Sequence, residues 1–258
     1  GHHTNEASYY LGRIEDDAGN TEQAIGYYQS VREGTYYFPS LARASALLTK
    51  EGKLDEALEV IRSLRSANPN QAENFWLLEV NLLLDQNLRE EALEAATSAL
   101  ADHPGNLQIR YARAMLFDNL DQPAKAEEDL KQIVENNPEN AVALNALGYI
   151  LTTRTDRLGE ARSYIEQALT LDPENPAILD SMGWVLFQEG QIQPALDYLS
   201  RAWAAFPDPE VAAHYGEALW VNGAEEQAQI IWEEGLEQDP EHDVLLETIE
   251  RLTVTGEQ

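Results

Sequence analysis

The chain lacks cysteine and is poor in basic residues: 17 Lys and Arg face 46 Asp and Glu, for a net charge of −29 over 258 residues. Without cysteine the sequence can form neither a disulfide framework nor a thiolate metal site. The strong acidity argues against nucleic acid or an anionic membrane surface as the main partner. The sequence also has no apolar run of about 20 residues, so no segment is expected to span a membrane.

Catalytic signatures are missing as well. The sequence contains no His-Glu-x-x-His motif, no Gly-x-Ser-x-Gly motif and no phosphate-binding loop. The histidines are scattered, and the Asp180-Ser181 pair is typical of ordinary helix sequence rather than of a nucleophile beside its base. We therefore expect no enzymatic activity, no cofactor, no metal and no small-molecule substrate.

The sequence does contain an internal repeat, with a period of 33 to 35 residues. An alanine recurs once per period, at Ala24, Ala57, Ala92, Ala126, Ala161, Ala195 and Ala228, and a proline recurs at Pro69, Pro104, Pro138, Pro173, Pro207 and Pro240. Each period predicts two helices, because apolar and small residues recur at helical spacing, as from Leu179 through Gly183 to Leu186. The small residues Gly183 and Ala195 are expected to let the two helices approach closely.

Two segments, "NALGYILTTRTDRLGEARSYIEQALTLDP" and "DSMGWVLFQEGQIQPALDYLSRAWAAFPDP", resemble the tetratricopeptide repeat in their glycine, alanine and proline landmarks. The resemblance predicts an all-α fold, a right-handed superhelical solenoid of helix-turn-helix units with a C-terminal capping helix. We place the units at 5–37, 38–72, 73–106, 107–140, 141–175, 176–208 and 209–242, and the capping helix at 243–253. Because the helical pattern begins almost at once, we expect a C-terminal fragment of a longer protein.

The first helices of such a solenoid line a concave groove, which can hold an extended peptide or a partner's helix. One step round the helix from the packing stripe, the fourth to seventh units carry aromatic and polar side chains. We predict a protein-binding groove formed by Tyr111, Met115, Asn145, Tyr149, Asp180, Trp184, Phe187, His214 and Trp220. Aromatic side chains dominate many binding interfaces. In the alternative, which stays open at this stage, these rings pack between adjacent repeats.

Acidic charge is concentrated toward the C-terminal end. From Leu171 onward, 19 acidic residues face only Arg201 and Arg251, a net charge of −17. This part of the chain would attract basic partners, or would serve only as a solvated face. Some tetratricopeptide proteins hold chaperone C-termini with paired lysines and asparagines. That clamp is not expected here, because no lysine pairs with an in-phase asparagine in the next unit.

The second half also resembles the C-terminal repeats of proteobacterial tetratricopeptide lipoproteins of the outer membrane. Three segments, which overlap those quoted above, carry this resemblance: "LNALGYILTTRTDRLGEA", "PAILDSMGWVLFQEG" and "FPDPEVAAHYGEALWVNG". One type in this family is the adaptor of a C-terminal processing protease, which brings the protease and its cell-wall hydrolase substrates together. The resemblance implies a periplasmic adaptor, tethered in its full-length form by a lipid anchor that is absent from this chain. The alternatives are an assembly factor for an envelope or secretion machine, and a regulatory domain of a larger enzyme.

Overall fold

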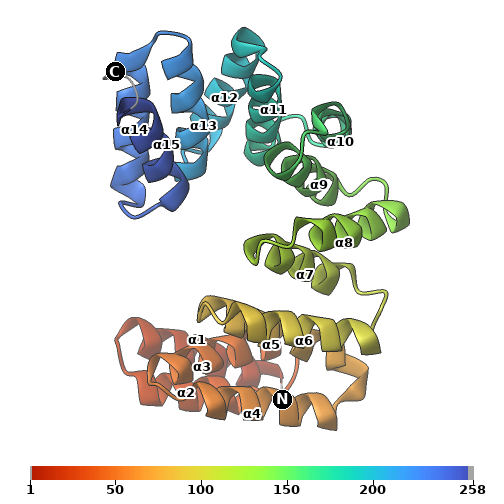
Figure 1. Ribbon diagram of the computed structural model, residues 1–258. Coiled ribbons are helices and arrows are strands. Elements are labelled where there is room, and N and C mark those ends of the chain that lie inside the picture. Colours follow the sequence, from red (N-terminus) through yellow and green to blue (C-terminus); the bar gives the residue numbers. More distant parts are fainter. Residues whose placement is uncertain (1, 255–258) are drawn as a thin grey trace. The chain divides into compact units, whose positions relative to one another are not determined.

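The computed structural model describes residues 2–254. Within this range the chain forms α-helices and one short 3-10 helix, and no strand. The all-helical architecture expected from the sequence is therefore confirmed. The chain divides into two compact units, Gly1–Leu120 and Asp121–Gln258 (Figure 1). The division into seven repeat units at the boundaries given above stays a prediction.

The first unit contains α1 (His2–Asp17), α2 (Thr21–Ser30), α3 (Tyr37–Lys50), α4 (Leu54–Ala67), the 3-10 helix η1 (Pro69–Gln71), α5 (Ala72–Asp85), α6 (Arg89–Asp102) and α7 (Leu107–Asn119). From α1 to α6, each α-helix packs against the next one along the chain, and α5 also contacts both α3 and α7. The apolar core of this unit includes Ile61, Phe75 and Ile109, all fully buried.

One buried charge in the first unit is fully compensated. Glu79 on α5 is 2% exposed, and its carboxylate accepts hydrogen bonds from Arg65 and, at 2.7 Å, from Arg62 on α4. The guanidinium of Arg65 also lies 3.3 Å from the ring centroid of Trp76. Pairing and hydrogen bonding are what make a buried carboxylate tolerable, so Glu79 ties α4 to α5.

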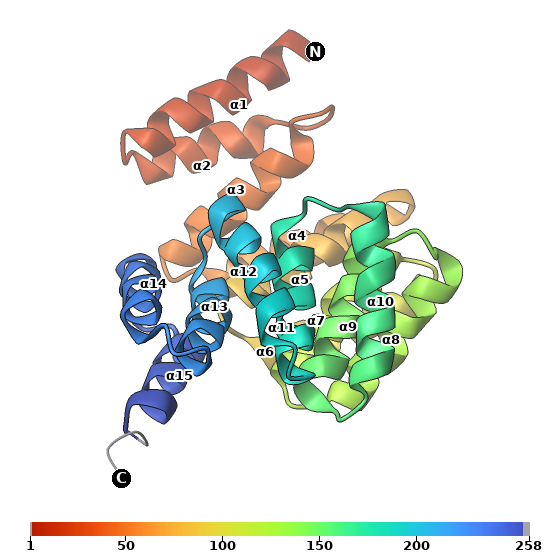
Figure 2. The ribbon, with the colours of Figure 1, turned by 90° about the horizontal axis from the view of Figure 1, so that it is seen from above.

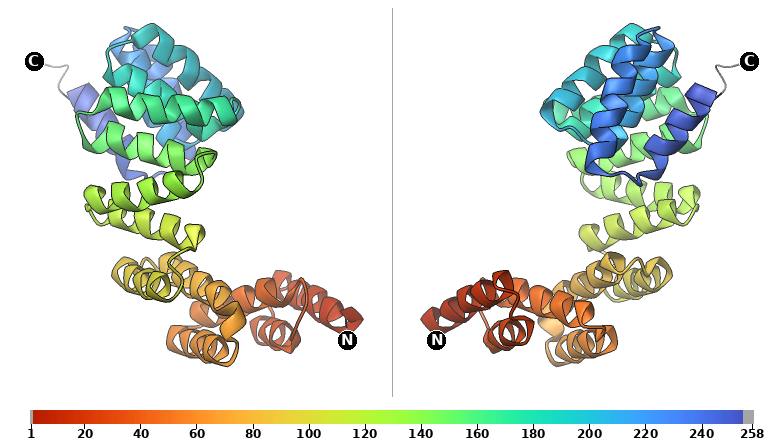
Figure 3. Two further views of the ribbon diagram at one scale, coloured as in Figure 1. Left: turned by 90° about the vertical axis from the view of Figure 1, so that its right-hand side faces the viewer. Right: turned by 90° about the vertical axis from the view of Figure 1, so that its left-hand side faces the viewer.

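The second unit contains α8 (Pro123–Asn136), α9 (Ala141–Arg154), α10 (Leu158–Leu171), α11 (Pro176–Gln188), α12 (Ile192–Ala205), α13 (Pro209–Val221), α14 (Glu225–Gln238) and α15 (Asp243–Val254). The helices pair as α9 with α10, α11 with α12 and α13 with α14, and α11 also contacts the neighbouring first helices α9 and α13 (Figure 2). α15 packs against α13 and α14. In Figure 3 the green to blue helices of this unit follow one another as successive pairs.

Local sequence signals explain where these first helices begin. Asn140, Asn175 and Asp208 each accept a hydrogen bond from a backbone N–H of the first turn. Proline follows the cap in α11 and α13, where its missing N–H would have no partner inside the helix.

Within each of three pairs, a glycine lets the two helices approach closely. A Cβ added at Gly183 would lie 2.5 Å from Leu199 Cγ and 3.1 Å from the carbonyl oxygen of Ala195. At Gly148 it would lie 2.4 Å from Ile165 Cγ1 and 2.8 Å from a backbone oxygen, and Gly216 meets Trp232 in the same way. The close approach expected at Gly183 and Ala195 is confirmed.

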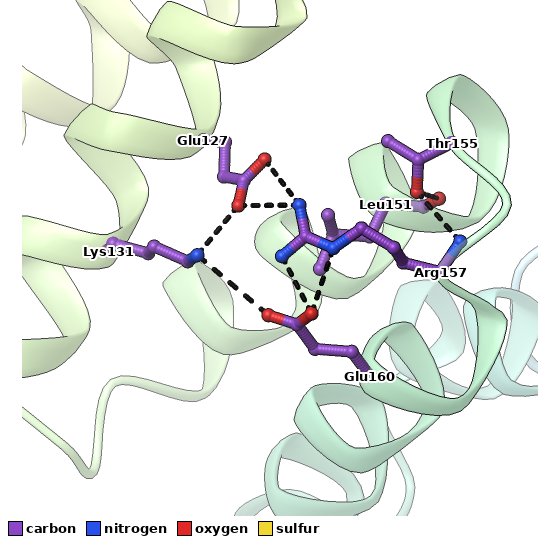
Figure 4. A network of polar contacts seen from close by, with 6 residues as sticks. All are labelled: Glu127, Lys131, Leu151, Thr155, Arg157 and Glu160. Atoms are coloured by element: carbon purple, nitrogen blue, oxygen red, sulfur yellow. Dashed lines mark hydrogen bonds and ion pairs between the residues drawn. The ribbon is translucent and has the colours of Figure 1, made fainter.

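An ion-pair network joins the second helices α8 and α10 (Figure 4). Arg157 Nη1 lies 2.9 Å from both carboxylate oxygens of Glu127, and Arg157 Nη2 lies 2.6 Å from Glu160. Lys131 Nζ lies 2.7 Å from Glu127. Burial works to raise the pKa of the Glu127 carboxyl, but hydrogen bonds and charge from Lys131 and Arg157 outweigh it and hold this pKa below its ordinary value. The network therefore ties one repeat to the next.

We predict that Gly148→Ala lowers the free energy of unfolding by about 1–3 kcal/mol, the usual cost of overpacking. The gain in helix propensity, about 1 kcal/mol, is smaller, and the contact with a backbone oxygen cannot relax by a side-chain rotation. Urea denaturation followed by circular dichroism measures the effect. Gly159→Ala on α10 is the matched control, because a Cβ there meets nothing within 4 Å. An equal effect of both substitutions would contradict the close-contact explanation.

Candidate functional site

Aromatic rings from the first helices of the second unit form one cluster. The Trp184 indole on α11 stacks on the imidazole of His214 on α13, with ring centroids 4.1 Å apart and an interplanar angle of 17°. Trp184 also stacks on Phe187, at 5.2 Å and 12°. The ring of Tyr149 on α9 lies 6.1 Å from that of His214. We call these four residues the ring cluster.

A buried ion pair joins one member of the ring cluster, His214, to Asp180 on α11. His214 Nδ1 lies 3.0 and 3.1 Å from the two carboxylate oxygens of Asp180, and the two residues are only 3% and 6% exposed. Burial works to lower the pKa of the His214 imidazole, but the charge and hydrogen bond of Asp180, with smaller contributions from Glu210 and Glu217, outweigh it. The pKa of His214 is raised above its ordinary value. The pair therefore links α11 to α13 most strongly when His214 is protonated.

Two further carboxylates border the ring cluster. Glu210 on α13 accepts a hydrogen bond from the hydroxyl of Tyr149 on α9. Glu217, also on α13 and 6% exposed, accepts a 2.6 Å hydrogen bond from Arg251 Nη2 on α15. Side chains of α13 thus make polar contacts with α9, α11 and α15. The surroundings of the cluster carry more acidic than basic groups.

The aromatic rings of the cluster differ in their burial. Trp184 and Phe187 are half-buried, whereas His214 and Asp180 are buried. The Trp184 side chain extends from α11 and stacks on His214 of α13, so its ring contributes to the contact between successive repeats. The same half-buried rings also retain accessible surface. The structure therefore brings together Tyr149, Asp180, Trp184, Phe187 and His214, while their role in partner binding stays a prediction.

The ring cluster as defined above does not include the other four predicted groove residues. Trp220 stacks on Trp232 of α14, with centroids 5.4 Å apart, and so packs inside its own helix pair. Asn145 on α9 is half-buried, and its Oδ1 atom has no hydrogen-bond partner among the described residues. Tyr111 and Met115 are half-buried on α7, in the first unit. Burial raises the pKa of the Tyr111 hydroxyl.

Glu210, Glu217 and Arg251 were not among the predicted site residues. The repeat spacing is a sequence signal for two ion pairs, His214 with Asp180 and Arg251 with Glu217, because the partners in each pair are 34 residues apart. A separation of one repeat period places two residues on neighbouring first helices. Opposite charges one period apart are therefore candidates for contact between repeats.

Across residues 2–254 no group of three or more His, Cys, Asp or Glu residues is arranged to hold a metal ion. Over the same range no helix combines the length and the apolar character needed to cross a bilayer.

The fold and the ring cluster together define a repeat protein whose successive helix pairs present side chains from their first helices. Family models described as tetratricopeptide repeat match residues 6–33, 77–120, 111–176 and 154–213, and together they span more than half of the chain. The chain therefore belongs to the tetratricopeptide repeat proteins. Proteins of this class generally mediate protein–protein interactions, and the class is generally non-enzymatic.

A curated relative supports the same assignment. The chain is 40% identical over 247 residues to a TPR repeat-containing protein of Pseudomonas aeruginosa. The match covers 96% of this chain but 42% of that protein, so the chain spans about two fifths of the relative's length.

Solved structures of the same fold are similar over most of the chain. A tetratricopeptide repeat protein from Parabacteroides merdae superimposes with a TM-score of 0.70 at 17% identity, covering 98% of this chain and 99% of that one. A thermophilic TPR protein from Thermus thermophilus gives 0.62 at 21% identity, covering 70% and 99%. PilW, a type IV pilus biogenesis factor, gives 0.63 at 15% identity, covering 84% and 100%. At these identities the likeness shows the tetratricopeptide solenoid fold alone.

We predict that the stabilising effect of His214 falls as the pH rises. A histidine whose pKa is raised on folding contributes stability that is complete below the pKa of the unfolded chain, about 6.5, and that is lost as the pH rises through the folded-state pKa. The difference in unfolding free energy between the wild type and His214→Gln should therefore be larger at pH 5.5 than at pH 9.

Urea denaturation at both pH values gives this difference. NMR titration of the His214 ring should show a midpoint above that of a histidine in a short peptide, and Asp180→Asn should lower that midpoint. A stability difference that grows between pH 5.5 and pH 9 would contradict the assigned protonation of the pair.

Proposed function

We propose that the chain is a non-enzymatic adaptor of the bacterial envelope that captures a segment of a partner protein at the ring cluster. The observation that carries the proposal is the meeting of Tyr149, Trp184, Phe187 and His214 from three consecutive first helices. Stacking holds these rings in place before a partner arrives, so binding costs little side-chain entropy. Ordered aromatic rings of this kind are frequent binding hot spots.

Charge supports a partner segment that combines an apolar anchor with basic residues. Glu210 is half-buried at the edge of the cluster, and the chain from Leu171 onward carries a net charge of −17. A field of one sign steers oppositely charged partners and repels acidic ones. The apolar anchor would contact the accessible surface of Phe187 and Trp184.

The envelope role rests on the sequence resemblance to outer-membrane tetratricopeptide lipoproteins, which the segments between Leu144 and Gly223 carry. In that role the full-length protein is periplasmic and tethered to the outer membrane by a lipid anchor. Its partners are a C-terminal processing protease and the cell-wall hydrolases that the protease degrades. The chain would present the hydrolase to the protease and would itself perform no chemistry.

Reconstitution tests the delivery role directly. A purified processing protease from the same bacterium degrades a cell-wall hydrolase with and without the chain, and the rate of hydrolase loss is followed on gels. We expect faster loss with the chain present. An unchanged rate would contradict delivery to the protease, and capture of pilus or secretion components from envelope extract would favour the assembly-factor alternative instead.

We predict that Phe187→Ala weakens binding of the captured partner by at least about fivefold, because truncation of a hot-spot ring costs about 1 kcal/mol or more. Isothermal titration calorimetry measures the affinity. Phe206→Ala is the matched control, since Phe206 is 58% exposed at the end of α12 and lies outside the ring cluster. Equal losses in the two variants would show that binding does not involve the cluster.

We also predict that partner affinity falls as salt rises from 50 to 500 mM, since exposed charges are screened over about 10 Å at 0.1 M. The Phe187→Ala variant should keep the same dependence on salt, because it removes an apolar contact only. Affinity that does not change with salt would exclude a steering role for the acidic residues.

A further inference from the structure

α1 exposes an apolar stripe along one face. Leu11 is 40% exposed, Tyr10 is 45% exposed and Ile14 is 61% exposed, and Ala7 is exposed as well. These four residues stand at positions i, i+3, i+4 and i+7, so they share one side of the helix. We call them the α1 stripe. Figure 2 shows α1 at the end of the first unit, with α2 along one flank.

Three of the four equivalent positions of α3 are buried next to the preceding helix pair, and the fourth, Arg43, is exposed. Ala44 and Leu47 stand 33 residues after Leu11 and Ile14 and are only 2% and 4% exposed. They form one apolar cluster with Ala24 and Tyr28 of α2, the second helix of the pair before α3. What covers this face of α3 is therefore a second helix of the same repeat type.

The same comparison holds in the second unit. Ile178, Met182 and Val185 on α11 stand 171 residues after Ala7, Leu11 and Ile14, and they are 2%, 4% and 0% exposed. α11 packs against α10, the second helix of the pair before it. The positions of the α1 stripe are thus the positions at which a first helix packs against the preceding helix pair.

We infer that the α1 stripe is the docking face of a further tetratricopeptide helix pair, supplied by the same polypeptide ahead of Asn5. The Pseudomonas aeruginosa relative is long enough for such a pair, because this chain matches 42% of it. An exposed apolar stripe in register with buried ones is what an array shows at an uncovered end, since each repeat buries its apolar face against its neighbours. The inference does not depend on the ring cluster.

A second copy of this chain fits the stripe less well. In a head-to-tail contact, the last helix pair of one copy, α13 with α14, would have to cover α1 of the next. α15 already packs against both of these helices. The place that a following first helix would take is therefore filled by the chain's own last helix.

Two extended chains test the inference. In one, a copy of residues 141–175 is joined directly ahead of Asn5, so that a second α10 meets α1 in the register in which α10 meets α11. In the other, a copy of residues 5–37 is joined at the same place and offers a second α2. Thermal unfolding followed by circular dichroism should show a melting temperature several degrees higher for at least one extended chain than for the original chain.

Ile14→Glu separates docking on the stripe from a general effect of added length. The substitution should change the melting temperature of the original chain little, because Ile14 is 61% exposed. In the stabilised extended chain the same substitution should abolish the gain. If neither extension raises the melting temperature, or if Ile14→Glu leaves the gain intact, the inference is wrong. Sedimentation of the original chain as a dimer that Ile14→Glu dissociates would also overturn it, in favour of a second copy.

Discussion

Each helix pair in this chain buries its apolar surface only by contact with its neighbours, and this constraint governs the rest of the structure. Gly148, Gly183 and Gly216 bring the two helices of a pair close together, but a pair of short helices encloses too little apolar area to be stable alone. The remaining burial comes from the next first helix, as where Val211 of α13 packs with Ala202 of α12. Contacts between repeats are therefore as important for stability as contacts within them.

The same constraint explains why charged groups are buried on the first helices. A side chain that reaches the neighbouring first helix leaves water, so its charge must be compensated there. Asp180 is paired with His214 and Glu217 is paired with Arg251, each one repeat period away, and Glu79 is paired with two arginines of the adjacent helix α4. Such pairs add little net stability once desolvation is counted. They do fix which helices adjoin, because a shifted register would leave a carboxylate buried and unpaired.

The sequence predicted the fold well because its signals are periodic. Small residues at a fixed phase, such as Gly183, mark the contact inside a pair, and proline marks the ends of pairs. The candidate site was predicted in part. Tyr149 and Trp184 stand 35 residues apart, and Asp180 and His214 stand 34 residues apart, so each of these two pairs lies at one phase on consecutive first helices and faces the same way. Trp220 stands one period after Phe187 but packs on Trp232 instead. Periodicity predicts which face of a helix a ring lies on. It does not predict which of two neighbouring side chains the ring packs against, because that depends on the local shape left by the surrounding side chains.

In the proposed function, the ring cluster would serve stability and recognition with the same atoms, and this limits how its role can be tested. Trp184 lies against His214, and the His214–Asp180 pair joins α11 to α13, so removing the indole would disturb the junction between two repeats as well as the accessible surface. Phe187 stacks on Trp184 but belongs to the same helix, so its loss leaves the ion pair in place. A reduced affinity in a Phe187 variant therefore reports on the surface, whereas a reduced affinity in a Trp184 variant would mix the two effects. If the proposed function holds, half-buried rings next to a buried ion pair give the chain an ordered binding surface without a separate enclosed pocket.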